Sequence, residues 1–117
     1  MLRFVLFPES VPPARRLCLL ATDPALLRAA LSEHSRENAH PRYDPAHYPD
    51  TYVKFLLGGG GLVPLPPGVW VLNKIGQAYG FLLDNAYVKD EAHGVEFLLS
   101  AVPYVNADGV LNDDKYE

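Results

Sequence analysis

The sequence contains a single cysteine, Cys18, among its 117 residues. One thiol cannot form an internal disulfide, so the cysteine content gives no sign of an oxidising compartment or of a structural zinc site. Leu17 precedes Cys18 and two leucines follow it, an apolar setting that is typical of a thiol packed as a small hydrophobic residue. We therefore expect Cys18 to be an inert, buried residue.

An excess of positive charge is also absent, because 10 Lys and Arg residues stand against 14 Asp and Glu, for a formal net charge of −4. Such a chain has little charge available to neutralise phosphates, so we expect no nucleic-acid partner. Hydrophobic residues make up 49% and aromatic residues 11% of the chain, which excludes a disordered acidic segment. The length suits a single domain with a modest core.

Long apolar runs are missing as well. Residues 2–7 are apolar but stop at Pro8, which is too short for a signal-peptide core or a membrane span. We predict one strand there, followed by irregular chain through Pro12 and Pro13.

Glycines and prolines concentrated at residues 58–68 separate residues 1–57 from residues 69–117. Asp23 as a cap and Pro24 at the first helical position predict a helix over residues 24–36. A short helix capped by Asp50 is predicted over residues 51–57, and a Gly/Pro hinge over residues 58–68. We treat residues 1–117 as a single partial domain.

After the hinge, three segments rich in β-branched and aromatic residues cover residues 69–72, 78–88 and 95–105, with a hairpin at 89–94. This pattern predicts an α+β fold with an antiparallel sheet of at least three strands and one or two short helices. Its Phe97-Leu98-Leu99 run is apolar on both faces and so needs cover on both sides. We expect that cover to come from a partner or from self-association.

Familiar catalytic arrangements are largely absent. No Ser-x-x-Lys and no Gly-x-Ser-x-Gly occurs. His40, Asp44 and His47 could converge on a metal in a helix, but Pro41 and Pro45 oppose a helix and favour a solvated loop. The glycines at 58–61 lack the Lys-Ser/Thr of a phosphate loop and indicate a linker.

Two further features are more distinctive. Three tyrosines could line a ligand groove, although packing over the neighbouring helix is the simpler expectation; they are Tyr43, Tyr48 and Tyr52. In the second feature, Lys74 ends an apolar strand and is followed by Gly76. A glycine within a strand often marks the close approach of a ligand or another backbone.

The segments around Lys74 resemble the carboxyl-terminal sheet of a β-lactamase-like serine hydrolase. The resemblance covers roughly residues 33–117 and rests on three runs. These are the run from Asn73 to Phe81, the run Leu83-Asp84-Asn85-Ala86-Tyr87-Val88, and the stretch from Val95 to Asn106. The closing segment, residues 109–117, fits the same group.

In that superfamily, which includes class A β-lactamases and penicillin-binding proteins, a Ser-x-x-Lys helix, a Ser-x-Asn loop and a Lys-Thr-Gly strand meet in the active site. By resemblance, Lys74-Ile75-Gly76 takes the place of the third motif. Lys74 would supply positive potential and help to orient the nucleophilic hydroxyl, and Gly76 would let the substrate lie against the strand. The backbone N–H of Gln77 would donate to the oxyanion, where charge develops only in the transition state. Ile75 stands where Thr or Ser would bind a substrate carboxylate, which departs from β-lactam recognition.

The resemblance therefore implies the carboxyl-terminal portion of a serine hydrolase that acts on an amide or ester through an acyl-enzyme. These residues lack Ser-x-x-Lys and Ser-x-Asn, so they would be catalytically incomplete alone. The resemblance implies no cofactor and no metal, a small-molecule or peptide-like substrate, and a bacterial protein that is periplasmic or exported. The expected partner is the remainder of the hydrolase domain or a second copy. Two alternatives remain open, a non-catalytic binding or assembly module that retains the sheet and a metal-dependent enzyme that uses the histidine cluster.

Overall fold

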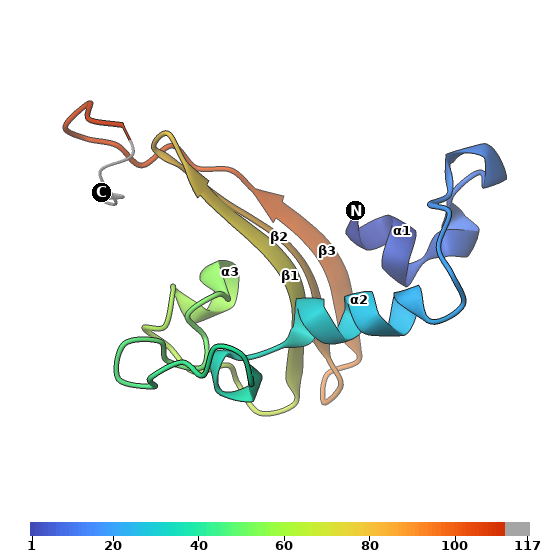
Figure 1. The fold of residues 1–117 in the computed structure, drawn as a ribbon, viewed down its shortest axis with the longest axis horizontal. Helices are drawn as coiled ribbons and strands as arrows, with labels where there is room; N and C mark the ends of the chain where they lie inside the picture. The colour runs from blue at the N-terminus through green and yellow to red at the C-terminus, as the bar shows by residue number, and fades with distance from the viewer. Residues whose placement is uncertain (112–117) are drawn as a thin grey trace.

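The structure, a computed structural model, describes residues 1–111. Three short helices precede the sheet: α1 (Leu2–Leu6), α2 (Asp23–Ser32) and α3 (Phe55–Gly58). The strands follow as β1 (Val69–Ala78), β2 (Phe81–Asp90) and β3 (Val95–Ala101) (Figure 1). They form one antiparallel sheet in the order β1-β2-β3. The predicted α+β fold with a three-stranded antiparallel sheet is confirmed.

The strand boundaries differ from the prediction at the first hairpin. β1 runs to Ala78 rather than to residue 72, and β2 begins at Phe81 rather than at residue 78. Between them, Tyr79 and Gly80 both have positive φ, at 53° and 79°. Two residues with positive φ make the tight hairpin turn whose twist matches the flanking strands, so the chain reverses there despite the tyrosine.

The expected strand at residues 2–7 is wrong, because this segment forms α1. Leu2 and Val5, three residues apart, are both buried. A short apolar run satisfies the strand period and the helix period equally, and here packing selects the helix. α2 is also shorter than expected. It ends at Ser32 because Glu33 adopts an extended ψ of 136°, and Asp23 accepts the Leu20 N–H from inside the first turn.

Residues 51–57 were expected to form a helix, but only Phe55–Gly58 does so. Asp50, the expected cap, instead pairs with Arg36. Gly59 ends α3 in the left-handed conformation at φ 56°. The following glycine segment is a hydrogen-bonded turn, in which the Val63 N–H donates to Gly58 and the Thr51 hydroxyl donates to the Val63 carbonyl.

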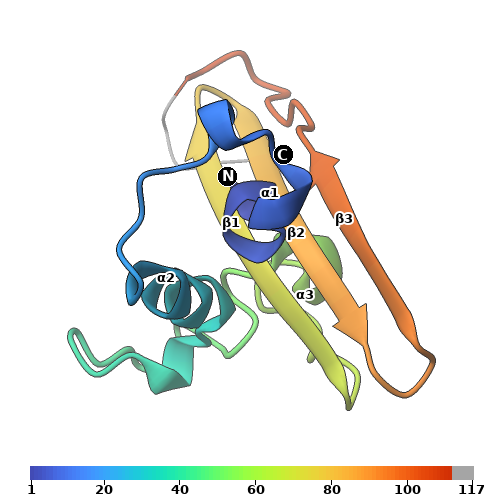
Figure 2. The ribbon, with the colours of Figure 1, turned by 90° about the vertical axis from the view of Figure 1, so that its right-hand side faces the viewer.

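The helices lie on different sides of the sheet. α1 lies over one face, α3 lies over the other, and α2 runs beside β1 (Figures 1 and 2). On the α3 face the core consists of Val71, Ala86 and Val88. On the α1 face the ring of Tyr87 packs edge-on against Phe7 at a centroid distance of 5.6 Å.

β3 is the least covered part of the sheet. Phe97, Leu98 and Leu99 alternate between the two faces, yet each is 43–46% exposed. Cover for both sides of this run was expected, and residues 1–111 do not supply it. Within the same residues, no strand pairs with the outer edge of β3. Apolar side chains at an open edge make β3 a surface prone to association.

Two further observations concern the rest of the described chain. Cys18 is exposed, so the expectation of a buried thiol is wrong. Its segment runs between the short helical turn at Pro13–Arg15 and α2, and most of the residues in it are exposed. None of the helices in residues 1–111 has the length and hydropathy that a membrane span requires.

Candidate functional site

The strand that carries Lys74 is an edge strand, and its backbone groups alternate between β2 and the open side. The Lys54 ammonium donates to the carbonyl of Val71 from outside the sheet. At the other end of the pairing, Leu82 faces Gln77, yet the Leu82 N–H donates to the carbonyl of Pro103 on its far side. Both bonds show that the odd-numbered residues of β1 form non-hydrogen-bonded pairs with β2.

The N–H and carbonyl of Gln77 therefore point away from β2. Gln77 is exposed, and no backbone hydrogen bond from another segment of residues 1–111 reaches it. A backbone N–H at such an edge is available to an acceptor from a ligand or from another chain segment. The same parity points the carbonyl of Ile75 outward, where it accepts a hydrogen bond from Lys74 Nζ at 2.5 Å.

Lys74 is exposed and lies on the face of the sheet that α1 covers. It lines a cavity of about 420 Å³ together with Arg3, Asn85 and Ser100. The Ser100 hydroxyl donates to the amide oxygen of Asn85 at 2.5 Å. Within residues 1–111 the Lys74 ammonium has no carboxylate partner, so its charge is not neutralised by an ion pair.

Lys74 and Gly76 share one face of β1, whereas Ile75 lies on the opposite face, level with Asp84. A Cβ atom added to Gly76 would lie 2.9 Å from two side-chain carbons of Leu83 on β2. Gly76 thus has a packing reason to be glycine, independent of any ligand. The four predicted residues are contiguous on one strand, but only Lys74 lines the cavity.

A buried polar network on the α3 face was not predicted from the sequence. Lys54 is 1% exposed, and its ammonium donates to the carbonyls of Leu31 and Val71 at 3.2 Å and to Asn73 Oδ1 at 2.9 Å. The Asn73 amide donates in turn to Asp84 Oδ1 at 2.9 Å. Asp84 also accepts the Leu56 N–H.

The Lys54 network joins α2, the chain before α3, and β1. Burial lowers the pKa of Lys54 from 10.5 to about 8, although the charge of Asp84 opposes that shift. The sequence does carry a signal for it, because Asn73 and Asp84 interrupt apolar strands at positions of one face. The network holds β1 at Val71 and Asn73, and it does not involve the outward backbone groups of Gln77.

The histidine cluster does not assemble into a metal centre. His47 Nδ1 lies 2.7 Å from Asp44 Oδ2, on an exposed loop. His40 instead has its backbone N–H bonded to Asn38, within the same loop. No group of three His, Cys, Asp or Glu residues in the described chain could hold a metal ion.

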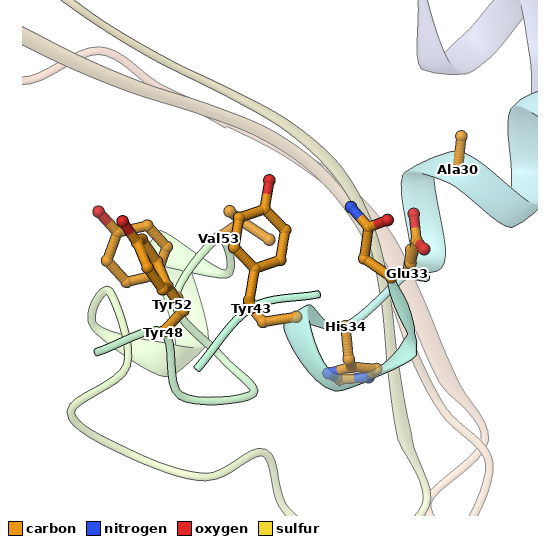
Figure 3. Close-up of a pocket in the computed structure, with 9 residues that line it drawn as sticks. Ala30, Glu33, His34, Tyr43, Tyr48, Tyr52 and Val53 are labelled. Atoms are coloured by element: carbon orange, nitrogen blue, oxygen red, sulfur yellow. The ribbon is translucent and has the colours of Figure 1, made fainter. Parts of the chain in front are cut away.

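The three tyrosines pack against one another in series. The ring centroids of Tyr43 and Tyr48 are 5.1 Å apart, as are those of Tyr48 and Tyr52. They line a cavity of about 250 Å³ that reaches the end of α2 at Glu33 and His34 (Figure 3). Of the two readings of these residues, the ligand groove has a cavity to support it.

Comparison with known protein families, with curated proteins and with solved structures finds no match for this chain.

Proposed function

We propose that this chain is the carboxyl-terminal portion of a β-lactamase-like serine hydrolase and forms one wall of its active site. The observation that carries the proposal is the open edge of β1, where the Gln77 N–H points outward beside the unpaired charge of Lys74. In a site of this superfamily, a fixed N–H donor would stabilise the oxyanion and a lysine near the nucleophile would supply positive potential.

In this proposal each residue of the strand has a separate role. The Gln77 N–H donates to the oxyanion as the tetrahedral intermediate forms. Lys74 supplies positive potential near a serine hydroxyl that another part of the enzyme contributes. Gly76 lets an amide or ester substrate lie close to the strand, and Ile75 borders the same edge.

The first test is the mass and activity of the native gene product. The product is purified from its source cells with an antibody against this segment, and its intact mass is compared with 12.9 kDa. The proposal predicts a product two to three times heavier that hydrolyses a chromogenic cephalosporin or a p-nitrophenyl ester. A product of 12.9 kDa with no hydrolysis of either substrate overturns it.

Substitutions in that longer product then test the two roles. Lys74→Ala should lower kcat/KM by about 100-fold or more, on the scale of losing one electrostatic group. The matched control is Lys89→Ala, which removes a lysine of β2 that pairs with Glu91 in the turn after that strand. Equal activity in the two variants contradicts the role of Lys74.

The role of Gln77 rests on its backbone, so the informative substitution is Gln77→Pro. Proline removes an N–H that points away from β2, a position where an edge strand tolerates it. Gln77→Ala changes the side chain but keeps the N–H, so the difference between the two variants isolates the donor. We expect Gln77→Pro to be about 100-fold less active than Gln77→Ala.

One observation favours a second candidate, a non-catalytic binding or assembly module. The open edge of β3 carries apolar side chains on both faces, as an assembly surface would. Under this alternative the chain self-associates, and the sedimentation coefficient rises with protein concentration. Phe97→Lys, which adds a charge to the edge, should then reduce that rise, whereas a monomer at every concentration contradicts the assembly role.

A further inference from the structure

The tyrosine cavity differs from the β1 edge in its elements and its chemistry. It lies between the end of α2 and the loop at residues 43–53, on a different part of the fold (Figure 3). Its walls are the rings of Tyr43, Tyr48 and Tyr52 together with Val53. Its volume of about 250 Å³ is just below the usual range of about 300–1,000 Å³ for drug-sized ligands. The site therefore suits a small molecule or one end of a larger one.

The tyrosine rings present their π-systems at several angles. The planes of Tyr43 and Tyr48 are inclined by 52°, and those of Tyr48 and Tyr52 by 79°. All three rings are about 39% exposed, so part of each remains open after they pack together. The faces of aromatic rings carry negative potential, which attracts cations, and several rings at different angles can contact one rounded cation together.

The carboxylate that lines the cavity is negative, as is the potential at the faces of the rings. Glu33 lines it, and within residues 1–111 no hydrogen bond or ion pair of its carboxylate is found. His34 also lines it, and burial, with the charge of Lys54 as a second cause, lowers the pKa of His34 and so favours the neutral ring. Of the nearby cations, Arg36 pairs with Asp50, and Lys54, which is buried in its own network, interacts with Glu33 only from beyond ion-pair distance.

We propose that this cavity binds an organic cation, specifically an alkylated ammonium group, against the tyrosine rings with Glu33 as the counter-charge. A quaternary ammonium is preferred because it is bulky, weakly hydrated and unable to donate hydrogen bonds, so ring faces replace its water at little cost. A compact primary ammonium is more strongly hydrated and loses more on entry.

The test uses the full 117-residue chain and two probes of the same shape. Choline is titrated while the NMR resonances of residues 30–53 are followed, and 3,3-dimethyl-1-butanol, its uncharged counterpart, is titrated in parallel. Choline should saturate the shifts at a concentration at least about tenfold lower than the alcohol. Equal binding of the two, or no binding of choline, overturns the proposal.

Two substitutions assign the binding to the cavity. Glu33→Gln keeps the shape of the side chain and should weaken choline binding by about three- to tenfold. Its matched control is Glu9→Gln, which makes the same charge change in the short turn at Pro8–Ser10. If both substitutions weaken choline binding equally, the effect comes from the overall charge of the protein, and the proposed site is wrong.

Tyr48 touches both of the other tyrosines, so Tyr48→Leu should weaken binding by about fivefold or more, whereas Tyr48→Phe keeps a ring face and should bind within about twofold. Equal affinity of these two variants overturns the role of the rings.

A final arm compares choline with Nα-acetyl-trimethyllysine methylamide. Tighter binding of choline indicates a free small cation, and tighter binding of the amide indicates a modified side chain.

Discussion

Replacement of Lys54 by methionine is expected to lower the free energy of unfolding by about 2–4 kcal/mol. Methionine is of similar length and fills much of the same space, but it cannot donate a hydrogen bond. The carbonyls of Leu31 and Val71 and the amide oxygen of Asn73 would all lose a donor. Asp84 would also lose the positive charge that faces its carboxylate.

The magnitude follows from two opposing effects. Three buried acceptors without a donor cost about 1–3 kcal/mol each, or about 3–9 kcal/mol together. Against this, burial lowers the pKa of Lys54 from 10.5 to about 8. At about 1.4 kcal/mol per pH unit, burial of the ammonium charge costs about 3 kcal/mol at pH 7. Methionine carries no charge, so the substitution removes this cost. The unpaired acceptors cost about 6 kcal/mol at the middle of their range, and removal of the buried charge recovers about 3 kcal/mol. The net loss is about 3 kcal/mol.

Urea unfolding followed by tryptophan fluorescence measures this loss, because Trp70 is the only tryptophan and lies on β1. Lys89→Met is the control, since Lys89 lies at the surface and should cost less than about 1 kcal/mol. Adding Asp84→Asn to Lys54→Met should restore at least about 1 kcal/mol, because the unpaired buried charge is then gone. If Lys54→Met is as stable as Lys89→Met, the network does not hold these elements together.

Two other outcomes follow from the structure. Because burial lowers the pKa of Lys54 to about 8, the unfolded chain binds more protons than the folded chain between pH 8 and 10.5. Stability should therefore rise across that window by up to about 1.4 kcal/mol per pH unit in the parent relative to Lys54→Met, and urea midpoints at pH 7.5 and 9.5 test this difference. Gly58→Ala should destabilise the chain by about 1–3 kcal/mol, even though alanine is the better helix former, because its Cβ would lie 2.5 Å from the buried Cβ of Thr51. A melting temperature equal to or above that of the parent would show that the loop at Thr51 yields easily.

The predicted elements succeeded where local signals were strong. Pro24 and the apolar spacing after it were sufficient for α2, and the turn residues at 89–94 were sufficient for the second hairpin. The strand predicted at residues 2–7 was wrong because a run with only five apolar residues fits a strand and a helix equally. The prediction that Cys18 is buried was wrong because apolar neighbours in the sequence do not imply burial when the segment runs over the surface.

The candidate sites divide in the same way. Lys74 and Gly76 could be singled out from the sequence, since a lysine and a glycine in an apolar strand are visible there. That the Gln77 N–H points outward depends on which pairs of β1 and β2 exchange hydrogen bonds. Pairing register is a tertiary property, because a shift by one residue exchanges the inward and outward groups along the whole strand.

The sequence by itself determined the α+β class, the three strands and the residue types available for chemistry, because these depend on local periodicity and turn-forming residues. Only the tertiary structure decided that Lys54, Asn73 and Asp84 meet, since they lie on separate segments and a buried lysine is stable only where acceptors surround it. It also decided that three tyrosines and Glu33 line one cavity, because the fold brings together residues that no sequence spacing relates.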